Sequence, residues 1–105
     1  MNVLTINGRL TKEVLIKKTE TGKTYCKFSV AVNRSKDGVD YIPCLAWGKR
    51  AEFLAEHFQK GDGINLIGKL QSGQYDNKEG EKVFTLEVLV NQVSFPVGVK
   101  RTEIV

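Results

Sequence analysis

The sequence predicts an all-β domain with one helix, on the basis of three observations. Several segments alternate apolar and polar residues with a period of two, which is typical of half-buried strands. One segment, residues 49–59, instead spaces its apolar residues as i, i+3, i+4 and i+7, the pattern of a helix with one buried stripe. The stripe consists of Ala51, Leu54, Ala55 and Phe58. The 105 residues suffice for one small core, so we expect a single domain over residues 1–105, with residues 96–105 as a short C-terminal tail.

Five strands are expected, three before the helix and two after it. Their expected positions are residues 3–10, 26–32, 40–47, 64–71 and 83–95. Turn-forming residues lie at 35–38 and 76–80, and Gly61 suits the left-handed position after the helix. A helix between the third and fourth of five strands is the order of the OB-fold. That fold is a five-stranded, partly open Greek-key barrel that presents strands 2–3 and their loops to oligonucleotides.

Charge is unevenly distributed along the chain. The net charge is +4, but residues 1–50 hold ten Lys and Arg against four Asp and Glu, a net +6. Residues 51–105 hold six against eight, a net −2. Such polarity is expected of a basic face for a polyanion, and a solvated lysine-rich surface explains it equally well. Charge alone leaves both interpretations open.

Patterns typical of membrane, secreted and catalytic proteins are not found. No segment approaches the ~18 apolar residues of a membrane span, and the N-terminus does not resemble a signal peptide, so we expect a cytoplasmic protein without a membrane partner. Cys26 and Cys44 lack a further cysteine or histidine at metal-ligand spacing, and we expect both buried and reduced. No catalytic motif is present, and His57 lies off the helical stripe. We expect no enzyme activity, no metal and no cofactor.

The segment 40–47 carries large aromatic residues on one face of a strand. Alternation groups Ile42, Cys44 and Ala46 on one face, and Tyr41, Pro43, Leu45 and Trp47 on the other. Lys49 and Arg50 follow directly, and the next strand leads through Lys69 and Gln71 to Tyr75. Rings and cations on one sheet face suit the stacking of unpaired bases and the neutralisation of phosphates. The aromatic face either packs against another layer or is exposed for a ligand, and alternation leaves both open.

A succession of short motifs resembles the bacterial single-stranded DNA-binding protein (SSB) family over about residues 2–95. In order, the motifs are Gly8-Arg9-Leu10-Thr11-Lys12, Phe28-Ser29-Val30-Ala31-Val32-Asn33-Arg34, Asp40-Tyr41-Ile42-Pro43-Cys44, Trp47-Gly48-Lys49-Arg50-Ala51-Glu52, Lys60-Gly61, Gly68-Lys69-Leu70-Gln71, Tyr75 and Thr85-Leu86-Glu87-Val88. Each motif is weak alone, and the ordered set is specific. The resemblance implies an OB-fold protomer that assembles as a homotetramer, a dimer of dimers. It also implies binding of single-stranded DNA with little sequence preference, during replication, recombination or repair.

The resemblance further implies which side chains contact DNA. Tyr41, Trp47 and Tyr75 fall at the positions where the family stacks bases on aromatic rings. Polar and basic positions of its DNA groove correspond to Arg9, Lys17, Arg34, Lys49, Arg50, Lys69 and Gln71.

Three features depart from the family pattern. Glu13-Val14 replaces the usual Asp-Pro after the first strand, so that loop is expected to differ. Only one tryptophan is present, and tyrosines stand at two of the stacking positions, which predicts a lower affinity per base. The sequence ends at Lys100-Arg101-Thr102-Glu103-Ile104-Val105, without the Gly-rich linker and acidic tip of typical cellular members. We therefore expect no tail-mediated recruitment of replication enzymes, in a short form such as a phage or mobile element carries.

Two other binding functions remain open at this point. An OB-fold that prefers RNA, or a primosome-type accessory protein, would use the same stacking chemistry, since only contacts to the 2′-hydroxyl separate RNA from DNA. A protein-interaction module would use the Tyr41/Trp47 face against a partner protein. A nuclease is least supported, because the sequence offers no metal-binding constellation.

Overall fold

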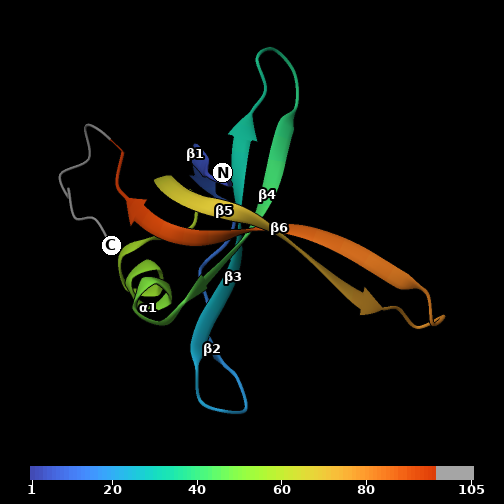
Figure 1. Cartoon of the computed structure of the whole chain (residues 1–105). Helices are drawn as coiled ribbons and strands as arrows, with labels where there is room; N and C mark the ends of the chain where they lie inside the picture. The colour runs from blue at the N-terminus through green and yellow to red at the C-terminus, as the bar shows by residue number, and fades with distance from the viewer. Residues whose placement is uncertain (97–105) are drawn as a thin grey trace.

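The computed structural model describes residues 1–96. The expected C-terminal tail therefore lies outside the described residues, except for Pro96. Six strands and one helix follow one another in this part of the chain (Figure 1): β1 (Leu4–Leu10), β2 (Lys17–Lys18), β3 (Thr24–Asn33), β4 (Val39–Trp47), α1 (Gly48–His57), β5 (Gly63–Asp76) and β6 (Lys82–Ser94). Five of the strands are long, and α1 lies between the third and fourth of these, as predicted. No helix among residues 1–96 is long and apolar enough to cross a membrane.

The strands form one sheet that closes partly on itself. Their order is β1-β5-β6-β4-β3-β2, and β1 also pairs with β3 at Arg9↔Ala31 and Leu10↔Val30. The β4–β6 pair is parallel, whereas the other pairs are antiparallel. Residues 4–8 of β1 pair with β5 alone, so the barrel is open along the other side of β1. The predicted OB-fold is confirmed.

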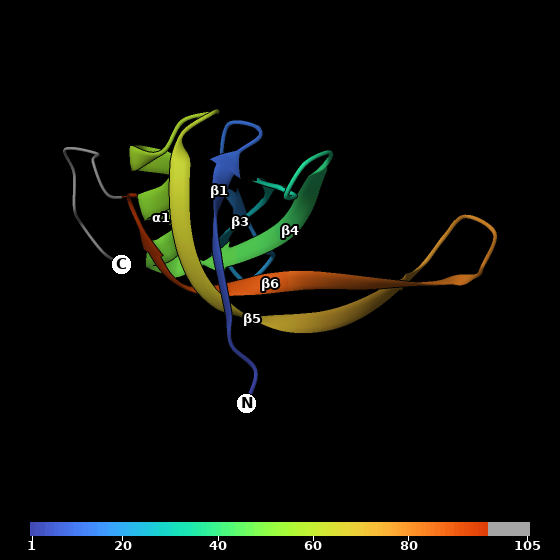
Figure 2. The same ribbon diagram turned by 90° about the horizontal axis from the view of Figure 1, so that it is seen from above.

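The core fills the barrel and continues beneath α1, which packs against β3, β4 and β6 (Figure 2). Its fully buried side chains include Leu10, Cys26, Val30, Cys44, Ala46, Leu54, Ile64, Leu66, Val88 and Val93. The predicted buried stripe is confirmed, since Ala51, Leu54 and Phe58 are buried and Ala55 is half-buried, but α1 ends at His57 and Phe58 is already extended. Each large apolar side chain buried in this way contributes about 1.5–3 kcal/mol. Gly61 has a φ of 90° after the helix and donates its N–H to the Leu10 carbonyl at 2.9 Å, which ties the helix end to β1.

The β3–β4 hairpin and the β5–β6 hairpin extend away from the barrel (Figures 1 and 2). The longer one is formed by β5 and β6, and over residues 71–87 these two strands pair only with each other. We call residues 71–87 the arm. The radius of gyration is 14.6 Å, whereas a compact domain of this length has about 13 Å. The projecting hairpins account for the excess and give the molecule a long outer surface.

The arm differs from the sequence-based expectation in two respects. β5 continues through Tyr75 to Asp76, whereas residues 64–71 were expected, because Gly73 pairs in register with Thr85 instead of ending the strand. Phe84, Leu86, Val88 and Val90 alternate on one face of β6 as predicted. Only Val88 and Val90 reach the core, whereas Phe84 and Leu86 are 75% and 60% exposed. Alternation identifies a face, and it does not show where the core beneath that face ends.

The two-residue strand β2 was not predicted from the sequence. Lys17 pairs with Tyr25, and Lys18 pairs with Thr24. Two residues are too few for an alternation pattern, and their side chains are exposed. The strand matters because it adds two lysines to the edge of β3.

Candidate nucleic-acid interface

Cross-strand register brings many of the predicted site residues onto one face of the sheet. Residues directly opposite each other on paired strands point to the same side, and residues two apart on one strand do so too. Three rows on the side away from the core are Lys17–Tyr25–Trp47, Lys27–Leu45–Leu89–Lys69 and Arg9–Ala31–Tyr41. We call the side chains of these rows, with Gln71 and Tyr75 further along β5, the outer face. It runs from the β2–β3 edge to the arm.

The aromatic face of β4 is mostly exposed, so it does not pack against another layer within residues 1–96. Tyr41 is 66% exposed and Trp47 is 40% exposed, while Leu45 between them is 6% exposed. Pro43 is also exposed. Leu45 forms an apolar floor, and the two rings rise on either side of it. Exposed rings on a structured floor are suited to stacking against flat ligands.

Trp47 is in contact with a second ring that the sequence analysis missed. Tyr25 lies directly opposite Trp47 on β3, with the ring centroids 5.3 Å apart and the planes tilted by 40°. A shallow hollow beside this pair is lined by Thr19, Tyr25, Lys27, Leu45, Trp47 and Glu87. Tyr25 precedes Cys26, where the predicted strand began. Extending the alternation by one residue would have placed Tyr25 on the same face as Lys27.

Tyr41 and Tyr75 are exposed without aromatic support. Neither ring contacts another ring within residues 1–96. Tyr75 is 57% exposed and lies on the arm, opposite Val83. The three predicted stacking rings therefore share a face of the sheet, but only Trp47 is held by contact with a second ring within residues 1–96.

Lys49 and Arg50 lie in the first turn of α1, directly after Trp47. Both are exposed, no acidic residue occupies this turn, and no side chain caps the helix start. Cations at a helix N-terminus face the positive end of the helix dipole, which is unfavourable by a few tenths of a kcal/mol. An approaching phosphate would relieve this repulsion. The local arrangement thus favours an anion beside Trp47.

Arg34 differs from the other predicted cations because it has an acidic partner. Its guanidinium lies 2.7 Å from Asp40, and its Nε donates a hydrogen bond to that carboxylate at 2.8 Å. This hydrogen bond and the charge of Asp40 raise the pKa of Arg34. Arg9, Lys17, Lys49, Arg50 and Lys69 form no ion pair within residues 1–96. A phosphate reaching Arg34 must therefore compete with Asp40.

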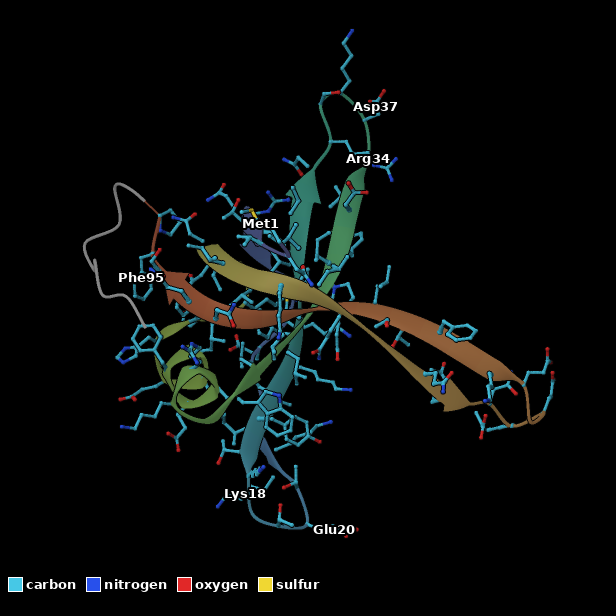
Figure 3. The ribbon with its side chains drawn as sticks, in the orientation of Figure 1. Met1, Lys18, Glu20, Arg34, Asp37 and Phe95 are labelled. Atoms are coloured by element: carbon cyan, nitrogen blue, oxygen red, sulfur yellow. The ribbon has the colours of Figure 1, made fainter. Side chains whose placement is uncertain are left out.

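Three of the candidate cations, Lys17, Arg9 and Arg34, lie at different points along β3 or directly after it. Figure 3 shows Arg34 at the base of the β3–β4 loop, near one end of β3. Lys18, on the neighbouring β2, lies near the other end of β3. Arg9 lies nearer the first of these ends, where its Nη2 donates to Asn33 Oδ1 at 3.2 Å. A spread of this kind suits an extended polyanion and does not suit a small anion held at one point.

Gln71 and Glu87 form a polar pair on the outer face. The Gln71 Nε2 donates to Glu87 Oε1 at 3.3 Å, so this predicted site residue already has a partner. Glu87 also lines the hollow beside Trp47. A carboxylate there repels phosphate, and it leaves the hollow better suited to a base than to the backbone. Sequence reasoning did not assign Glu87 to the interface, because register between β5 and β6 is needed to place it.

The core-facing cysteines lie on the other side of the same strands. Burial raises the pKa of Cys26 to about 11. Burial, followed by the charges of Glu87 and Cys26, raises the pKa of Cys44 to about 12. Both thiols are free and stay protonated at neutral pH, whereas the thiolate is the reactive form. Among the described residues, no group of three or more His, Cys, Asp and Glu side chains is arranged to hold a metal ion.

A small barrel whose outer face carries exposed rings and unpaired cations has the architecture of the oligonucleotide-binding β-barrels. The sequence of residues 1–96 matches the single-strand binding protein family. The chain belongs to this family.

Curated relatives carry the same designation. A "Single-stranded DNA-binding protein" of Fusobacterium nucleatum subsp. nucleatum is 42% identical over 103 residues, covering 90% of this chain and 66% of that protein. One of the same name from Clostridium tetani is 40% identical over 101 residues, covering 90% and 70%. "Single-stranded DNA-binding protein 1" of Clostridium acetobutylicum is 36% identical over 102 residues, covering 90% and 93%. The chain thus spans between 66% and 93% of the length of these three relatives.

Proposed function

We propose that this chain binds single-stranded DNA with little sequence preference. Bound in this way, it would protect exposed strands and remove hairpins during replication, recombination or repair. The observation that carries the proposal is that Tyr41, Trp47 and Tyr75 are all exposed on the face that also bears Lys17 and Lys69. Membership of the single-strand binding protein family and the names of the relatives support DNA as the ligand.

Two sets of side chains contribute to binding, one by stacking on bases and the other by neutralising phosphates. Tyr41, Trp47 and Tyr75 stack bases, each contributing about 1–3 kcal/mol, and every base offers a ring face, so sequence matters little. Each neutralised phosphate releases counterions and steepens the dependence of log affinity on log salt by roughly 0.7. The cations and the polar side chain proposed to contact the strand are Arg9, Lys17, Arg34, Lys49, Arg50, Lys69 and Gln71. Duplex DNA binds weakly, because its bases are already stacked on each other.

We also propose that residues 1–105 form one DNA-binding domain, with residues 96–105 as a short tail, and that this domain assembles as a homotetramer. Two features support self-association. Residues 4–8 of β1 leave one edge unpaired within the described part of the chain, and an open strand edge is a template for pairing with another chain. Leu70, Phe84 and Leu86 are exposed together on the other face of β5 and β6. Light scattering should then report a mass four times the 11.7 kDa of one chain.

The proposal is tested with a fluorescein-labelled oligo(dT) and four unlabelled competitors of equal length. Oligo(dT) and a mixed-sequence single strand should compete equally, whereas duplex DNA should compete weakly. An oligoribonucleotide that competes better than DNA would favour the RNA-binding alternative. No binding of any strand would leave the protein-interaction module, and defined cleavage in the presence of magnesium would indicate a nuclease.

A further inference from the structure

The ring of Tyr25 is the one aromatic contact of Trp47 within residues 1–96. The two residues lie directly opposite each other on antiparallel strands, and their rings are tilted by 40° with centroids 5.3 Å apart. Aromatic pairs are favourable at centroid separations between about 4.5 and 7 Å in tilted or offset geometries. Tyr25 is half-buried, whereas Trp47 is 40% exposed. The more buried ring therefore supports the more exposed one.

Trp47 occupies a position where support is needed. It is the last residue of β4, and the chain turns at Gly48, which has a φ of 60°, into α1. Beyond Trp47 there is no further strand residue on β4 to pack against the indole. An exposed side chain that is ordered only on binding costs about 0.5–1.5 kcal/mol of affinity, which corresponds to a two- to twelvefold weaker binding. A ring already held in place avoids that cost.

We propose that Tyr25 is a positioning residue for base stacking, acting through Trp47. This inference rests on the proposed function of the outer face. Tyr25 fixes the orientation of the indole, so that the remaining exposed surface of the ring meets an unstacked base. The hollow beside the pair offers an apolar floor from Leu45 and polar groups from Thr19, Lys27 and Glu87. These groups suit a nucleobase, which has flat apolar faces and polar edges.

The ring of Tyr25 carries this role, and its hydroxyl does not. The hydroxyl forms no hydrogen bond within the described residues, so nothing else in the fold depends on it there. Tyr25→Phe should therefore bind as the wild type does. Tyr25→Leu keeps an apolar side chain but removes the planar surface that faces the indole.

The test is a double-mutant cycle with the full chain and labelled oligo(dT). Tyr25→Leu should weaken binding two- to twelvefold at every salt concentration, with an unchanged salt slope, and Tyr25→Phe should restore the affinity. In a Trp47→Leu background, Tyr25→Leu should cause no further loss, because the residue it positions is absent. Phe53→Leu is the matched control. It removes a ring on α1 whose centroid lies 4.7 Å from that of His57, and it should leave the affinity for oligo(dT) unchanged.

A spectroscopic measurement separates positioning from general stability. Tyr25→Leu should increase the acrylamide quenching of Trp47 fluorescence and reduce the near-ultraviolet circular dichroism of the indole, and Tyr25→Phe should reverse both changes. If Tyr25→Leu does not fold, Tyr25→Val takes its place, because a β-branched residue favours a strand.

Two results would overturn the inference alone. One is equal affinity of the wild type and Tyr25→Leu for oligo(dT). The other is that Tyr25→Leu lowers the affinity as much in the Trp47→Leu background as it does in the wild type. A wild-type protein that binds no oligo(dT) would instead overturn the proposed function, and the inference with it.

Discussion

The region around Trp47 and the arm present the same stacking chemistry on very different supports. Trp47 stands at the end of β4, two residues from the buried Leu45 and against the ring of Tyr25. Tyr75 stands on a two-stranded ribbon, and apolar side chains on the other face of this ribbon, Phe84 and Leu86, are exposed as well. Isolated two-stranded hairpins are marginally stable in water. A base that stacks on Trp47 meets an ordered surface, whereas one that stacks on Tyr75 must also order the arm.

The difference indicates that exposure and residue type alone do not determine how much a stacking residue contributes to binding affinity. The contribution of a ring to affinity depends on what holds it before the ligand arrives, since the cost of ordering is subtracted from the gain. Regions with few buried apolar contacts open at low free energy. The Trp47 region should therefore supply affinity, and the arm should supply an adaptable extension of the binding surface.

The difference between the two regions is tested most directly by removing each ring in turn. Trp47→Ala should weaken binding of oligo(dT) by about 5- to 150-fold, the equivalent of roughly 1–3 kcal/mol for a stacked base. Tyr75→Ala should weaken it less, because part of its stacking gain is spent on ordering the arm. Anisotropy titrations at several salt concentrations measure both effects, and neither substitution should change the salt slope. Equal losses would contradict the distinction between the two regions.

The junction between barrel and arm depends on Gly68. A Cβ at this position would overlap the carbonyl of Leu89 and lie 2.9 Å from Val88 Cγ1. Gly68→Ala should therefore lower the free energy of unfolding by about 1–3 kcal/mol, as overpacking does. Gly73→Ala is the matched control on the arm, where the Cβ would meet only the Thr85 hydroxyl at 3.1 Å. Urea melts should show a larger loss in the free energy of unfolding for Gly68→Ala than for Gly73→Ala. The reverse order would contradict the close packing at Gly68.

Lys69 connects the two regions, because it lies in a row with Leu45 on the barrel and two residues before Gln71 on the arm. Lys69→Gln should flatten the slope of log affinity against log salt by about 0.7, the value for one phosphate on a single strand. Lys60→Gln removes the same charge outside the outer face and should leave the slope unchanged. If both substitutions flatten it equally, the strand follows the overall charge of the protein and does not follow the outer face.

The smallest expected effect concerns the ion pair at the far end of β3. Asp40→Asn frees Arg34 for phosphate, so affinity should rise by less than about fivefold, since exposed ion pairs are weak in water. The salt slope should become steeper at the same time. Adding Arg34→Gln to Asp40→Asn should cancel both changes. A loss of affinity on Asp40→Asn would show that the pair is needed to shape the β3–β4 hairpin.

Much of this architecture follows from local patterns in the sequence. The alternation from Cys26 to Val32 and the helical stripe from Ala51 to Phe58 each report a local period, so the strand, the helix and the buried faces were predictable. The position of Trp47 and Tyr41 on one face followed from the same alternation.

Features that depend on pairing between distant strands were not predictable. Tyr25 joins Trp47 only through the register of β3 with β4, and Glu87 enters the interface only through the register of β5 with β6. The Arg34–Asp40 ion pair depends on how the β3–β4 hairpin closes. Phe84 and Leu86 have the residue type and period of core positions, and their exposure arises because the arm extends past the barrel.

The most direct test of single-strand stacking on the outer face is a fluorescence titration of Trp47 with oligo(dT). Trp47 is the single tryptophan of the chain, so the emission reports one ring. Strong quenching is predicted at low salt, with weaker affinity at high salt and little response to a duplex of equal length. An unchanged emission at concentrations where labelled oligo(dT) is bound would contradict the account, because the strand would then avoid the ring on which it centres.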